Sequence, residues 1–161
     1  MARVTHRLYN HPVDFELCVR NVDKPPINFH DLSTRKLAMQ NAIQGQPWAG
    51  NVHLTTAPTF AEKATLFPGV TFLVGFDTFR RIADPKYYGG EEARSIAIKR
   101  IRDKGCRFLV FHRICDGKTS TMCDVARLFS DLTNLADVVP ATECPPSAIS
   151  SSEIRKTNDL R

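Results

Sequence analysis

The sequence contains no long hydrophobic run and no targeting segment. Its longest apolar stretch, Val70–Phe76, is interrupted by a threonine and a glycine, and a membrane-spanning helix needs roughly 20 apolar residues. The first seven residues, through Arg7, lack the apolar core of a secretory signal. These absences argue against a membrane protein and predict a cytoplasmic one.

The sequence is also poor in metal-binding and nucleic-acid-binding patterns. Its five cysteines form no CxxC pair and its histidines show no zinc spacing, so reduced thiols and no protein-held metal are expected. Lys+Arg 22 against Asp+Glu 17 gives a net charge of +5, without a block of five like charges. We therefore expect no nucleic-acid partner, whereas a phosphate ligand and an ordinary basic domain both fit this charge.

The sequence has the composition and patterning of one folded α/β domain. Its 161 residues are 42% hydrophobic and 24% charged, which is typical of a single globular domain over 1–161. Period-two alternation predicts a strand over 13–20, and an apolar run predicts a central strand over 70–74. Acidic residues early, basic residues late and a following glycine predict a helix over 91–104. Further strands are expected over 51–56, 106–112 and 136–139, and further helices over 31–43, 58–66, 78–82, 125–135 and from 150, after a poorly patterned segment 1–12.

Alternating strands and helices predict a Rossmann-like, doubly wound fold with a mainly parallel sheet and helices on both faces. In such folds ligands bind outside the carboxyl ends of the strands. The residues that follow the predicted strands are therefore candidates for a ligand site. They are Asn21–Lys24, Thr55–Thr59, Gly75–Asp77, His112–Arg113 and the C-terminal turn 150–155.

The strongest single motif is the serine-rich turn Ile149–Arg155. Small hydroxyl residues at a helix start let backbone N–H groups approach a phosphate, and an arginine one turn later can pair with phosphate oxygens. The same residues also fit a capping box between Ser150 and Glu153, with Arg155 solvated. Both interpretations are open on these residues alone.

This turn resembles the ISSTxIR motif of the nucleotidylyltransferase superfamily, which includes mononucleotide adenylyltransferases and cytidylyltransferases. Phe72–Asp77 resembles the strand-GxD motif of that family, and Phe108–Arg113 resembles its late strand ending in arginine. The resemblance runs in matching order from Val13 to Arg155. Shorter similar stretches are Phe15–Leu17, Asn21–Pro26, Ala57–Ala64 and Gly75–Gly90.

The resemblance implies transfer of a nucleotidyl group, adenylyl first of all, from a nucleoside triphosphate to a phosphate-bearing acceptor such as a mononucleotide, with release of pyrophosphate. It implies Mg²⁺ together with ATP or another nucleoside triphosphate. By the same resemblance the nucleotide-binding residues are Gly75, Asp77, Arg113, Ser150, Ser151, Ser152 and Arg155. Near the acceptor we expect Asp23, Lys24 and Thr59.

The HxGH motif of this family has no counterpart among the five histidines. We therefore expect the first strand–helix unit to be absent, through truncation, loss of catalysis, or supply of the unit from elsewhere. The order of the remaining motifs favours truncation. A strand missing from mid-sheet leaves an edge that a homo-oligomer would cover.

Three other functions are open on the sequence. The first is a non-catalytic nucleotide-binding domain of the same fold. The second is a phosphate-sugar or coenzyme-binding domain, although no GxGxxG follows a strand. The third, direct nucleic-acid binding, has only a modest basic stripe, which we interpret as the solvated side of a helix: Arg94, Lys99, Arg100 and Arg102.

Overall fold

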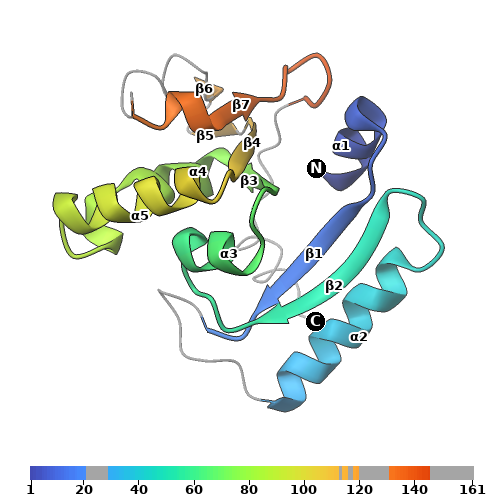
Figure 1. The fold of residues 1–161 in the computed structure, drawn as a ribbon. Coiled ribbons are helices and arrows are strands. Elements are labelled where there is room, and N and C mark those ends of the chain that lie inside the picture. Colours follow the sequence, from blue (N-terminus) through green and yellow to red (C-terminus); the bar gives the residue numbers. More distant parts are fainter. Residues whose placement is uncertain (21–28, 113, 116–117, 120–130, 146–161) are drawn as a thin grey trace.

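The computed structural model describes residues 1–20, 29–112, 114–115, 118–119 and 131–145. Within these residues the strands form two separate parallel sheets (Figure 1). The first sheet pairs β1 (Val13–Cys18) with β2 (Ala49–Thr55). The second has the order β3-β4-β7, with β3 (Thr71–Gly75), β4 (Arg107–Phe111) and β7 (Ala136–Val138). Two-residue strands β5 (Ile114–Cys115) and β6 (Lys118–Thr119) form an antiparallel pair.

In the described part of the chain, five α-helices connect and cover these strands. The clearest charge pattern is that of α5, which has Glu91 and Glu92 in its first turn and Arg100 and Arg102 in its last. Acidic residues at the N-terminus and basic residues at the C-terminus interact favourably with the helix dipole. Two short 3₁₀ helices span Pro85–Tyr87 and Thr133–Leu135. The α-helices are α1 (Ala2–Tyr9), α2 (Phe29–Ile43), α3 (Phe60–Leu66), α4 (Phe76–Ala83) and α5 (Glu91–Asp103).

The α/β class and the parallel pairing predicted from the sequence are confirmed, but the strands do not join into one continuous sheet. The described residues contain no strand that pairs with the second edge of β1 or of β3. The segment 1–12, which is poorly patterned in the sequence, contains α1. One helix prediction needs correction. The described part of the expected helix 125–135 is a turn and a 3₁₀ helix, and its residues 125–130 lie outside the described residues.

The main core lies on one face of the second sheet, under α3, α4 and α5. Phe108 of β4 is fully buried at its centre. Its ring centroid lies 5.6 Å from that of Phe60, 5.8 Å from that of Phe72 and 5.5 Å from that of Phe79. These are the separations of favourable aromatic pairs, so one strand residue joins two helices and the neighbouring strand.

The opposite face of the same sheet packs against α1. Leu109, Phe111 and Val139 are buried there, with Val4 of α1 and Leu73 of β3 against them. Successive side chains of a strand point to opposite faces, so Phe108 and Leu109 face different layers. The expectation of helices on both faces is therefore confirmed for this sheet.

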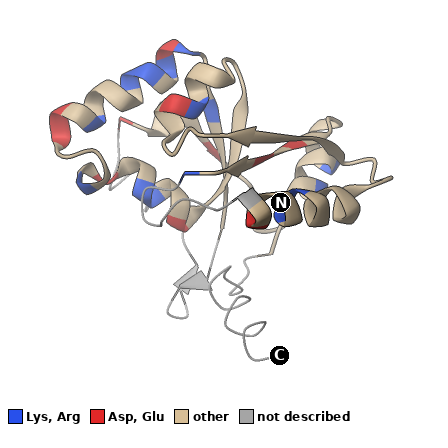
Figure 2. Cartoon of the chain, turned by 90° about the horizontal axis from the view of Figure 1, so that it is seen from below, with Lys and Arg blue, Asp and Glu red and all other residues tan. Residues whose placement is uncertain are grey.

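Charged side chains lie mainly on the helices, with basic and acidic residues interspersed (Figure 2). No helix among the described residues is long and apolar enough to cross a bilayer. Among the described cysteines, which form no disulfide bond, Cys106 is buried, whereas Cys18 and Cys144 are partly exposed.

Candidate functional site

The Gly75–Asp77 turn and His112 lie at the carboxyl ends of two neighbouring strands. β3 pairs with β4 in register up to Gly75↔Phe111. Gly75 ends its strand, and His112 follows directly after the end of the neighbouring strand. The Gly75–Asp77 turn and His112 therefore leave the sheet at adjacent positions.

Gly75 is the N-cap residue of α4 and has an ordinary extended backbone, with φ −75° and ψ 156°. Apart from its chain neighbours and its own helix, no described residue has an atom within 4 Å of a Cβ built on it. The fold itself therefore does not need glycine here, for either conformation or space. A glycine at this point leaves the backbone open to close approach by a molecule from outside.

Asp77 lies in the first turn of α4 and is half-buried. Buried Phe76 and Phe79 fix this helix on the core, so the position of the turn is set by packing. No side chain caps the helix at Gly75, and the N–H groups of a first turn have no partner within the helix. The turn thus places a helix N-terminus and the Asp77 carboxylate at the sheet edge.

Thr59 is predicted to lie near the acceptor substrate, and in the structure it is the N-cap residue of α3. Its hydroxyl accepts a hydrogen bond from Glu62 N–H over 3.3 Å, and the Glu62 carboxylate accepts one from Thr59 N–H over 3.5 Å. This is a capping box, so the structure gives Thr59 a role in the fold. A contact with an acceptor stays a prediction.

The other predicted site residues lie outside the described residues. The convergence of the serine-rich turn on the Gly75–Asp77 turn therefore stays a prediction. The residues concerned are Asp23, Lys24, Arg113, Ser150, Ser151, Ser152 and Arg155.

A polar cluster at the carboxyl ends of β1 and β2 was not predicted. The Lys63 ammonium of α3, only 10% exposed, lies 2.5 Å from a carboxylate oxygen of Glu16 in β1. The Thr55 hydroxyl donates to the same oxygen. Close by, the Cys18 thiol donates to the Ala57 carbonyl over 3.1 Å. This cluster fixes the start of α3, including Thr59, against the first sheet.

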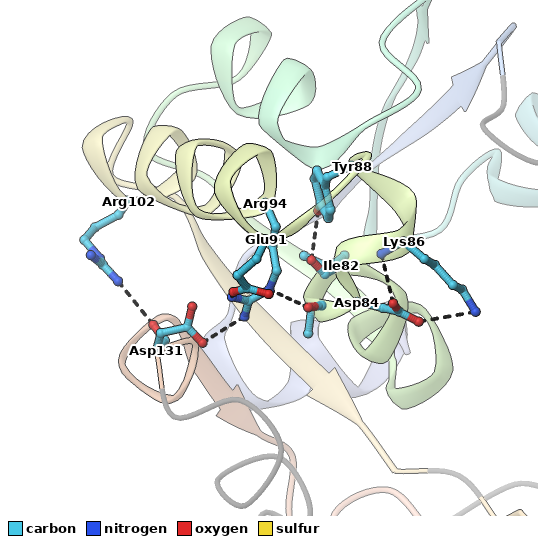
Figure 3. A network of polar contacts seen from close by, with 9 residues as sticks. Ile82, Asp84, Lys86, Tyr88, Glu91, Arg94, Arg102 and Asp131 are labelled. Atoms are coloured by element: carbon cyan, nitrogen blue, oxygen red, sulfur yellow. Dashed lines mark hydrogen bonds and ion pairs between the residues drawn. The ribbon is translucent and has the colours of Figure 1, made fainter.

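A second polar network surrounds Arg94 of α5 (Figure 3). Its guanidinium donates to the Ala83 carbonyl over 2.5 Å, to Glu91 over 2.7 Å and to Asp131 over 2.9 Å. The Arg94 side chain is 6% exposed, so the assignment of this residue to a solvated basic stripe was wrong. Burial alone would lower the pKa of Arg94, but Asp131 and Glu91 outweigh it and raise that pKa. The network joins α5 to α4 and to the segment before β7.

An open depression of about 380 Å³ lies between the end of α2 and β2. None of the described site residues Thr59, Gly75 and Asp77 lines it. Its polar lining consists mainly of carboxamides, with no charged side chain: Gln40, Asn41, Gln44, Gln46 and Asn51. It is therefore separate in composition and in place from the β3–β4 edge.

The described residues contain no group of three or more His, Cys, Asp or Glu side chains that could hold a metal ion. No family model, curated protein or solved structure matches the chain. The function is therefore argued from the site and the sequence motifs alone.

A further pair of polar residues gives a testable pH dependence. Asp14 accepts hydrogen bonds from His53 over 2.8 Å and from Asn51 N–H over 2.8 Å. Burial would raise the pKa of Asp14, but these bonds outweigh it and hold that pKa below its ordinary value of 3.8. A depressed pKa in the folded state contributes stability above the unfolded-state value, and this is lost as the pH falls through the folded value.

We therefore expect Asp14→Asn to flatten the loss of stability below about pH 4. Urea unfolding at a series of pH values measures this change. Because Asp14 is half exposed, the effect is small beside those of the core substitutions argued below. Identical pH profiles for the variant and the parent chain would show that the Asp14–His53 contact has no energetic role.

Proposed function

We propose that the chain binds a nucleoside triphosphate at the carboxyl edge of β3 and β4 and serves nucleotidyl transfer to a phosphate-bearing acceptor. The observation that supports this proposal best is the register Gly75↔Phe111, which puts the start of the Gly75–Asp77 turn and His112 at the ends of neighbouring strands. The ribose would approach the open backbone at Gly75, and Asp77 would accept hydrogen bonds from its hydroxyl groups.

In the proposed reaction a phosphate oxygen of the acceptor attacks the α-phosphorus of the triphosphate, and pyrophosphate leaves. No covalent nucleophile of the protein is required, since positioning and neutralisation of phosphate charge supply the catalysis. The serine-rich turn with Arg155, together with Arg113, would hold the phosphates. Mg²⁺ would take most of its ligands from triphosphate oxygens and water, which is compatible with the single carboxylate at Asp77.

The missing HxGH motif favours a second candidate function, in which the domain binds the nucleotide without turning it over. The two functions share the nucleotide site and differ in the products formed. Incubation of the 161-residue chain with ATP, Mg²⁺ and a mononucleotide, followed by pyrophosphate measurement, separates them. Steady pyrophosphate release supports transfer, and binding without release supports the non-catalytic domain.

The nucleotide site itself is tested by two variants at the turn. Gly75→Val places a branched side chain in the open space beside the backbone, and Asp77→Ala removes the carboxylate. We expect each to weaken ATP binding by about tenfold or more, which corresponds to loss of a contact of about 1.4 kcal/mol. Isothermal titration calorimetry with ATP and Mg²⁺ measures the affinity.

The matched control is Asp103→Asn, which removes a carboxylate from the exposed end of α5. This variant should bind ATP as the parent chain does. Gly75→Val and Asp103→Asn should unfold at urea concentrations similar to that of the parent chain, because a Cβ atom at Gly75 meets no described residue within 4 Å and Asp103 is exposed. Unchanged ATP affinity in both turn variants would overturn the proposed site.

A further inference from the structure

We draw no further inference here: the strongest candidate, the open depression of about 380 Å³ between the end of α2 and β2, has a lining of mostly exposed carboxamide and small side chains, and nothing in the described part of the chain shows which ligand would occupy it.

Discussion

Phe108→Ala is expected to lower the free energy of unfolding by about 3–5 kcal/mol, the range for removing a buried aromatic ring. The Phe108 side chain is fully buried and lies against the rings of Phe60, Phe72 and Phe79. Alanine would leave a cavity between α3, α4 and β3 that these rigid rings cannot fill by small movements. Since domains of this size are stable by only about 5–15 kcal/mol, this loss is a large part of the total stability.

Urea unfolding followed by circular dichroism measures this loss, with Leu66→Ala as the matched control. Leu66 is an apolar residue of α3 that is 55% exposed. Its replacement should change the free energy of unfolding by no more than about 0.5 kcal/mol. A loss below about 1 kcal/mol for Phe108→Ala would contradict the central position given to this ring.

Local sequence patterns were sufficient to predict most of the elements around these rings. The apolar run in β3 and the alternation in β1 both gave strands within two residues of the observed bounds. The charge order in α5 gave the observed helix. Each of these patterns lies within one helix or strand, so it can be recognised without knowledge of the tertiary structure.

Helix α1 shows what such patterns miss. Its inner face is short: Thr5 is buried and Val4 is partly buried, among polar and charged neighbours. Its position depends on packing against Leu109 and Val139, more than 100 residues further along the chain. The division into two sheets has the same origin, because strand partners are set by contacts between distant segments.

In the candidate site, too, some features were predictable from neighbouring residues in the sequence and others were not. The Gly75–Asp77 turn follows an apolar strand and was predicted from adjacent residues, and the structure puts it at the end of β3. The Glu16–Lys63 pair joins residues 47 positions apart, and a lysine in a short helix is usually solvated. The one available signal was the placement of Lys63 between Ala61 and Ala64, two small apolar residues that are both buried.

Arg94 is the clearest case of a residue whose role changed once its surroundings were known. We expect Arg94→Met to lower the free energy of unfolding by about 2–3 kcal/mol. Methionine keeps much of the apolar volume but leaves the Ala83 carbonyl without its charged donor, and an unpaired buried acceptor costs about 1–3 kcal/mol. The pairs with Glu91 and Asp131 contribute less, because those carboxylates are 66% and 44% exposed.

Lys99→Met is the matched control, because it removes one positive charge from the exposed side of the same helix. It should cost less than about 1 kcal/mol, the limit for an exposed ion pair.

Arg94→Lys keeps the positive charge but has a single ammonium group in place of the forked guanidinium. It should therefore lose most of what Arg94→Met loses, since one ammonium cannot reproduce the directions of three donors from Nε and both terminal nitrogens. Urea unfolding of the three variants measures these differences. Full stability of Arg94→Lys would show that charge alone matters at this position, and equal losses for Lys99→Met and Arg94→Met would show that burial of the guanidinium contributes nothing.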